Sequence, residues 1–357
     1  MTRPMFPHAF DSTMIASGRS CPQKLYRQYV EHWKPKTESV HLVAGGAFAK
    51  GIELARKAYY EGISTLPTVD YIEGPNGMER KVTWTDSPFH GTREDAEAIG
   101  IAGLIAAYGD FECPADSAKS LERTAGALEF YFANYPLGAD GMEPLKFANG
   151  ARAIEFAFAQ PLPVNHPVTG DPILYTGRCD MIAEFANGIY VVDEKTTSSL
   201  GASWARQWEM RSQFTGYIWA ARDYGIEATG AIVRGVSILK TKYDTQQAIT
   251  YRAPFEVDRW LDQTCRDIER YIEMWQRGQW DYDLDHACAE YGGCSFVQIC
   301  KSASPSSGSR CTSNNVSGTR WLAASCLCGN GKSPGDTLLT VRLLRSNKLS
   351  RACPLKT

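Results

Sequence analysis

A short segment in the middle of the chain, residues 177–195, has the pattern of a β-hairpin with a tight turn. It contains Asn187-Gly188, the dipeptide that most strongly favours a two-residue hairpin loop. With that turn, Ala186 pairs with Ile189, and the register of the whole hairpin follows from this pair. The chain is therefore expected to contain a β-sheet with this hairpin at its centre.

The predicted register gathers charged side chains on one face of the hairpin. It places Asp180 opposite Lys195, and Asp193 points to the same face because it lies two residues from Lys195. Carboxylates hold Mg²⁺ or Mn²⁺, which activate water and neutralise phosphate charge, and the lysine would position or deprotonate the water or stabilise developing charge. Glu194 points to the other face, where only its backbone carbonyl could reach a metal. A solvated Asp180–Lys195 salt bridge is the alternative interpretation.

Composition places few further limits on function. The 357 residues suffice for one large or two modest domains. No apolar run is long enough to span a bilayer and no signal peptide is evident, so we expect a cytoplasmic protein with no membrane partner. The net charge of −2 divides into +8 for residues 301–357 and −10 for the rest. The acidic body argues against attraction of nucleic acid to the whole surface, although not against a local basic groove.

The order of predicted elements indicates an α/β fold with a mixed central sheet flanked by helices. Helices are expected near residues 12–30, 41–60, 93–108, 117–135, 203–224 and 257–277, and strands near 151–161, 173–179, in the hairpin and within 230–252. The sequence predicts four divisions: a mainly helical region (1–150), an α/β core (151–285), a cysteine segment (286–301) and a disordered basic tail (302–357). The composition of the tail also resembles that of a sequence translated out of frame.

Several motifs resemble the PD-(D/E)XK nuclease superfamily and its RecB-like branch. Gly177-x-x-Asp180 and Asp193-x-Lys195 match the motif of the superfamily, and Gln213-x-x-x-Tyr217 stands where the branch carries Gln-x-x-x-Tyr. The resemblance implies a restriction-endonuclease-like sheet and a Mg²⁺- or Mn²⁺-dependent deoxyribonuclease. In it, Asp180 and Asp193 would bind the metal, Lys195 would be the catalytic lysine, Gln213 and Tyr217 would orient the site or the strand, and Arg178 would touch phosphate.

One residue departs from the pattern of the branch. An early helix of the branch carries Gly-x-x-His-x-x-Leu-Glu, and in residues 46–53 Ala49 occupies the histidine position. Glu53 lies one turn further on and on the same face, so it is a candidate for the missing ligand. A solvated helix carboxylate is the alternative interpretation of Glu53.

The cysteines near residue 290 are regularly spaced. Cys288, Cys294 and Cys300 are each separated by five residues, and clustered cysteines in a reducing compartment indicate metal or cluster ligands. Iron–sulfur clusters take four thiolates. The resemblance to the RecB-like branch implies a [4Fe–4S] cluster with Cys21 as the fourth ligand. A zinc site and simple buried cysteines are the alternatives.

These features predict an exonuclease of DNA recombination, repair or phage DNA metabolism. DNA would be its substrate, and recombination proteins such as single-strand annealing proteins or helicases would be its partners. The competing hypothesis is a DNA-binding or assembly protein of the same fold whose catalysis is weakened. Ala49 favours that alternative, whereas the complete set of Asp180, Asp193 and Lys195 opposes it.

Overall fold

Seven strands form one mixed sheet, which confirms the predicted α/β class. The structure is a computed structural model that describes residues 4–35, 38–74, 77–284, 286–289, 293–302 and 312–314. The strands of the sheet are β1 (Ala9–Phe10), β5 (Glu143–Pro144), β6 (Ile154–Asn165), β7 (Pro172–Phe185), β8 (Gly188–Thr197), β9 (Ala228–Ile238) and β10 (Tyr243–Tyr251). The central order is β1-β7-β8-β9-β10, with β5 and β6 on β7.

The central strands separate at one point of the sheet. β7 and β8 are antiparallel neighbours from Phe185↔Gly188 only as far as Met181↔Val192. Beyond that pair, β8 continues beside β9 in parallel, and β7 continues beside β6 and β1. The fork between β7 and β8 therefore opens at the next residue of each strand.

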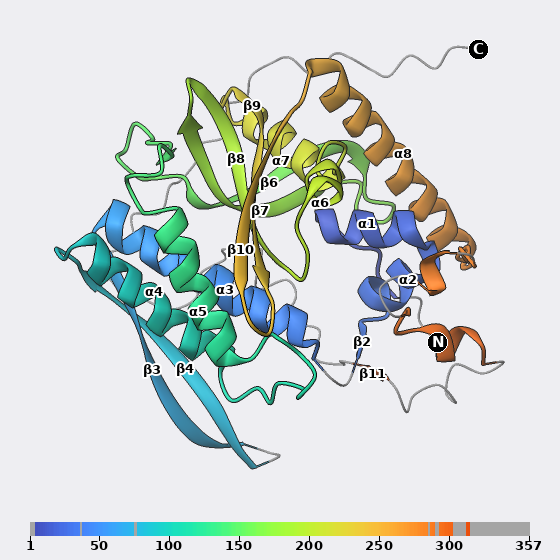
Figure 1. The fold of residues 1–357 in the computed structure, drawn as a ribbon. Helices are drawn as coiled ribbons and strands as arrows, with labels where there is room; N and C mark the ends of the chain where they lie inside the picture. The colour runs from blue at the N-terminus through green and yellow to red at the C-terminus, as the bar shows by residue number, and fades with distance from the viewer. Residues whose placement is uncertain are drawn as a thin grey trace. The chain divides into compact units, whose positions relative to one another are not determined.

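Helices cover both faces of the sheet. One core cluster holds Phe214 of α7 (Ser212–Asp223), Ile268 of α8 (Pro254–Arg277) and Val233 of β9. A second cluster joins Val236 of β9 to α3 (Val40–Arg56), α4 (Arg93–Tyr108) and α5 (Leu121–Asn134). Val233 and Val236 lie an odd number of residues apart, so they point to opposite faces. Figure 1 shows α7, α8 and α1 (Ser12–Ser20) on one side, and α3, α4 and α5 on the other.

Helix boundaries follow local capping. α1 begins after Asp11, whose carboxylate accepts a hydrogen bond of 2.7 Å from Met14 N. The predicted first helix breaks at Cys21, because Pro22 cannot continue the hydrogen-bond ladder and instead begins α2 (Pro22–Leu25), which is followed by a π-helical turn, Tyr26–Val30. The segment 203–224 likewise divides into α6 (Ala202–Arg206) and α7.

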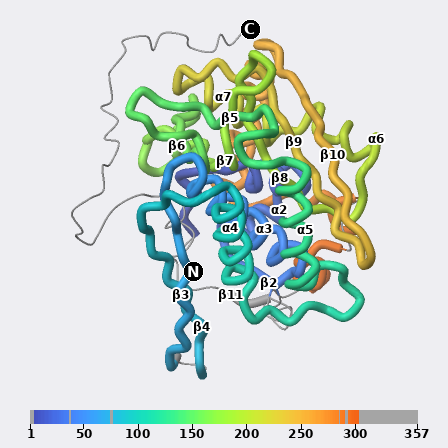
Figure 2. Tube along the Cα trace, turned by 60° about the vertical axis from the view of Figure 1, so that its left-hand side comes forward, coloured from blue at the N-terminus to red at the C-terminus, as the bar shows by residue number. Residues whose placement is uncertain are grey.

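A long hairpin interrupts the region predicted to be mainly helical. β3 (Ile63–Gly74) and β4 (Gly77–Pro88) pair antiparallel along their whole length, from Ile63↔Pro88 onwards. The ribbon extends away from the helices beside it (Figures 1 and 2). Most of its side chains are exposed, so its sequence lacks the strong apolar alternation that would predict these strands.

The C-terminal region is described only in part. The structure includes a 3₁₀ turn (His286–Cys288), α9 (Val297–Cys300) and β11 (Thr312–Asn314), which pairs with β2 (Trp33–Pro35). The rest of the predicted disordered tail lies outside the described residues, and the predicted domain divisions stay predictions. Within the described part of the chain, no helix is long and apolar enough to cross a membrane.

Candidate active site

The turn of the central hairpin differs from the predicted one. Ile189 pairs with Glu184 rather than with Ala186, so the predicted register is wrong. The two loop residues are Ala186 and Asn187, whose φ angles of 45° and 64° are the positive pair that a type I′ turn requires. The sequence signal identified the hairpin but placed its turn one residue too late.

Packing explains why glycine follows this turn. A Cβ on Gly188 would lie 2.8 Å from the ring of Tyr190, so the glycine provides room rather than an unusual backbone angle. The corrected register, continued one pair beyond the last ladder pair, places Asp180 beside Asp193 instead of Lys195. The residue opposite Asp180 thus moves by two positions along β8, from Lys195 to Asp193. Residues two positions apart on a strand point to the same face, so Asp193 and Lys195 share a face. We call Asp180, Asp193 and Lys195 the catalytic patch, and it lies at the fork.

Asp193 is the buried centre of this patch. Its Oδ2 lies 2.6 Å from Lys195 Nζ, and its Oδ1 accepts a long hydrogen bond of 3.4 Å from Gln213 Nε2. Gln213 also donates to Tyr217 Oη at 3.2 Å, so both motif residues of α7 face the patch. Gly177 allows this approach, because a Cβ there would lie 3.0 Å from the Tyr217 ring.

The two aspartates are held in an unfavourable electrostatic environment. Asp180 accepts a hydrogen bond of 2.9 Å from Glu194 N, but burial and then the charge of Asp193 raise its pKa well above the ordinary value. Burial also raises the pKa of Asp193, although Lys195 partly opposes the shift. Burial alone would lower the pKa of Lys195, but the two aspartates raise it above its usual range. The patch therefore carries a carboxylate pair that lacks full compensation.

Glu194 belongs to a separate network on the opposite face, as predicted for its side chain. Arg56 of α3 donates to both carboxylate oxygens, and Tyr131 of α5 donates to Oε1 at 3.0 Å. Arg234 contacts Tyr131 Oη at 3.4 Å and pairs with Asp140 at 2.6 Å. Burial alone would raise the pKa of Glu194, but Arg56 holds it below its ordinary value. Neither Arg56 nor Tyr131 was predicted from the sequence, although both lie on predicted helices.

Glu53 is buried, and its carboxylate pairs with lysines of its own helix. Its Oε1 lies 2.9 Å from Lys50 Nζ and 2.7 Å from Lys57 Nζ. Burial would raise its pKa, but the two ammonium groups lower it. Ala49 is half-buried on the same helix. Within the described structure, the hydrogen bonds and ion pairs of Glu53 thus go to lysines and not to the catalytic patch.

Glu155 is a site residue that the sequence did not reveal. Its φ of 51° is in the left-handed region, where a non-glycine residue on a strand is strained. Its carboxylate pairs with the exposed Arg178 at 2.7 Å, so this predicted phosphate contact already has a partner. Burial raises the pKa of Glu155 to about 7, and its charge in turn raises the pKa of Asp180. No local sequence pattern marks such a backbone conformation.

The four predicted cluster cysteines come from both ends of the described chain, and contacts with Asp283 link two of them, Cys21 and Cys288. Asp283 N donates to Cys21 Sγ at 3.4 Å, and Cys288 Sγ donates to Asp283 O at 3.8 Å. Burial raises the pKa of Cys300, the charge of Arg27 opposes this shift, and the thiols of Cys294, Cys21 and Cys288 add to it. All four are free thiols.

The described residues contain no group of three or more His, Cys, Asp and Glu side chains that could hold a metal ion. The catalytic patch instead offers two carboxylates, and Mg²⁺ commonly takes only one or two from a protein while it keeps several waters. Asp193 Oδ2 is buried and accepts no hydrogen bond with proper geometry, despite its ion pair with Lys195. A divalent cation would relieve this oxygen and the aspartate repulsion, so the donor set fits such an ion.

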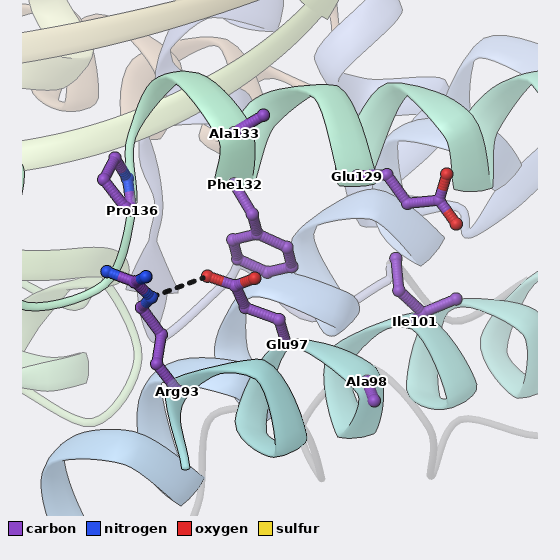
Figure 3. A pocket seen from close by; sticks show the side chains of 8 residues that line it. All are labelled: Arg93, Glu97, Ala98, Ile101, Glu129, Phe132, Ala133 and Pro136. Atoms are coloured by element: carbon purple, nitrogen blue, oxygen red, sulfur yellow. Dashed lines mark ion pairs between the residues drawn. The ribbon is translucent and has the colours of Figure 1, made fainter.

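A cavity of about 670 Å³ between α4 and α5 lies apart from these residues. Figure 3 shows Glu97 and Phe132 in its walls, with Arg93 paired to Glu97 at 3.9 Å. None of its lining residues belongs to the catalytic patch. The residues of the catalytic patch therefore lie at the fork and not in this cavity.

Comparisons with known proteins identify the family of this chain. A family model described as the PD-(D/E)XK nuclease superfamily matches residues 13–301, which include the whole catalytic patch. A solved structure named "Putative exonuclease" from Eubacterium rectale is similar with 12% identity and a TM-score of 0.44, over 80% of this chain and 89% of that chain. The structure of SSO0001 is similar with 15% identity and a TM-score of 0.27, over 51% of this chain and 69% of that one. No curated protein matches the chain. Because the family match spans most of its length, the chain belongs to the PD-(D/E)XK nuclease superfamily.

Proposed function

We propose that the protein is a Mg²⁺- or Mn²⁺-dependent deoxyribonuclease, an exonuclease of the RecB-like branch that serves DNA recombination, repair or phage DNA metabolism. The observation that carries the proposal is the catalytic patch, in which two aspartates lie side by side where β7 and β8 separate and Lys195 contacts Asp193 at 2.6 Å. Recombination proteins are the partners that this role implies.

Each residue of the patch has a distinct role in the proposal. Asp180, Asp193 and the carbonyl of Glu194 would hold the cation, which supplies an activated water and neutralises phosphate charge. Lys195 would stabilise the negative charge that develops on the phosphate. Gln213 holds Asp193 in place through its amide.

Cleavage of end-labelled linear DNA, single- and double-stranded, with Mg²⁺ or Mn²⁺ tests this proposal. We expect Lys195→Ala to reduce the cleavage rate about 10²–10⁴-fold, the usual range for loss of such a group. Lys240→Ala is the matched control, because Lys240 is an exposed lysine that follows β9 and does not belong to the patch. Equal cleavage by the wild type and Lys195→Ala would contradict the assignment of the site.

A weakened, DNA-binding protein of the same fold is the second candidate. Ala49 favours it. The ion pairs of Glu53 with two lysines also favour it, because Glu53 is the residue that could replace the missing histidine. This candidate predicts that the wild type binds DNA without cutting it and that Ala49→His introduces cleavage. Cleavage by the wild type at a rate that Ala49→His does not raise would exclude it.

We further propose that Cys21, Cys288, Cys294 and Cys300 bind a [4Fe–4S] cluster that joins the N-terminal helices to the C-terminal segment. Two observations support this, although Cys21 is more than 260 residues from the others in sequence: Cys21 and Cys288 both contact Asp283, and Cys300 interacts electrostatically with the other three thiols. Anaerobic purification followed by iron, sulfide and zinc analysis tests it. Iron and sulfide in equal amounts, lost in Cys21→Ser, are expected; zinc alone or no metal in folded protein would overturn it.

A further inference from the structure

A second cavity adjoins the catalytic patch through Gln213, which lines the cavity and donates to Asp193. It has a volume of about 470 Å³, within the range of about 300–1,000 Å³ that is typical of ligand sites. It lies where α1 and α7 begin, and the residues that matter in its lining are Ser12, Thr13, Arg19, Arg211 and Gln213. Gln213 is also the residue that donates to Asp193. A ligand in this cavity would therefore lie next to the reacting group.

The lining of this cavity is positively charged. It contains two arginines and no carboxylate, although the chain as a whole is acidic. Arg19 is neutralised by Asp267 at 2.6 Å and also donates to Ser212 Oγ. Arg211 is exposed, and no carboxylate of the described residues forms an ion pair with it. The uncompensated positive charge of the cavity thus belongs to Arg211.

Arg211 is also held close to the patch. It is the residue directly before α7, and its guanidinium lies 5.9 Å from the centre of the Trp208 ring. Its charge acts on Asp193, so the two groups lie within electrostatic range. A forked guanidinium, two hydroxyl groups and an amide are the donors that proteins commonly use for nucleic-acid phosphates.

The geometry points to this cavity as a binding site for a backbone phosphate of the DNA strand next to the bond that is cut, with Arg211 as the principal contact. The inference rests on the proposed nuclease function and adds the path of the strand. The strand crosses the beginning of α7, with Gln213 between the bound phosphate and Asp193. Arg211 is then a binding residue rather than a catalytic residue.

Salt-dependent binding of a short labelled oligonucleotide tests the phosphate contact. Lys195→Ala serves as the background so that the strand stays intact. Adding Arg211→Ala should weaken binding about tenfold near 0.1 M salt and reduce the slope of log K against log salt by about 0.7–0.9, the contribution of one phosphate contact. Adding Arg277→Ala, which removes an equally charged but distant and 68% exposed residue, should change neither quantity.

A scan with neutral methylphosphonate linkages locates the phosphate. In the wild type, one neutral linkage beside the cut bond should slow cleavage, and Arg211→Ala should be insensitive at that linkage alone. Arg211→Lys should retain the salt slope because it keeps the charge. If the wild type cuts and Arg211→Ala keeps both the slope and the methylphosphonate sensitivity, this inference is wrong while the nuclease proposal stands. If the wild type neither binds nor cuts DNA, the nuclease proposal itself fails.

Discussion

The carboxylates on the two faces of β8 have different hydrogen-bond partners and opposite pKa shifts. On one face, Glu194 receives hydrogen bonds from Arg56 and Tyr131, and its pKa is lowered. On the other face, Asp193 lies beside Asp180, has one oxygen without a proper hydrogen bond, and has a raised pKa. Adjacent residues of one strand thus experience opposite electrostatic environments.

The difference separates residues that stabilise the fold from residues that are available to a ligand. A buried carboxylate with a complete set of donors contributes to structure and has no capacity left for a metal or substrate. Two buried carboxylates that share one lysine repel each other, and a bound cation would relieve that repulsion. The following predictions test whether the two faces respond in opposite directions.

The largest effect on stability is expected from removing a partner of Glu194, whose carboxylate has a complete set of donors. Arg56→Met leaves Glu194 buried without its cation, so we expect a loss of about 3–5 kcal/mol in the free energy of unfolding. Urea denaturation followed by circular dichroism measures it. The double variant Arg56→Met/Glu194→Met should recover most of that loss, because it removes both charges. A single variant that is as stable as the wild type would contradict the structural role of the network.

An effect of intermediate size is expected in the pH dependence of the free energy of unfolding, to which Glu155 contributes. Its folded pKa of about 7 lies above the ordinary 4.5, so the protonated side chain favours the folded state and stability is lost as pH rises between these values. The slope for one proton is at most about 1.4 kcal/mol per pH unit. Without added metal, Glu155→Gln should make the stability curve less steep in this window, to which Asp180 and Asp193 also contribute through their raised pKa values, as urea titrations at several pH values would show. An unchanged slope would mean that another group titrates there.

The smallest effect should have the opposite sign. Asp193→Asn removes the repulsion with Asp180, so in metal-free buffer we expect an increase of about 1 kcal/mol in the free energy of unfolding together with loss of DNA cleavage. Thermal denaturation and the cleavage assay measure the two quantities on one preparation. Destabilisation by Asp193→Asn would show that the patch is structural, like the network on the opposite face.

Local signals in the sequence predicted much of the fold. The bounds of α4, Arg93–Tyr108, were correct, because Thr92 and Asp95 form a capping box and a glycine ends the helix. The hairpin was predicted from its Asn-Gly dipeptide. The turn position was wrong because Gly188 is required by the Tyr190 ring, a contact that turn statistics do not include.

The partners of the site depend on tertiary packing. Short motifs located Asp193, Lys195, Gln213 and Tyr217, and the structure brings these residues together. Arg56 could not be assigned to Glu194, because a contact across 138 residues has no local sequence signature. The strained backbone of Glu155 also has no local signature, and the ribbon of β3 and β4 lacked a signal because most of its side chains are exposed.

The fork in the sheet has a consequence for how such a protein could change over time. Where β8 loses its neighbour, the N–H of Glu194 is bonded by the carboxylate of Asp180, which thus replaces the missing strand residue. Loss of Lys195 would remove the ion pair of Asp193, whose raised pKa favours its neutral form, whereas replacing Asp180 would leave a backbone donor without its acceptor. Among inactive descendants, the lysine should therefore disappear before this aspartate.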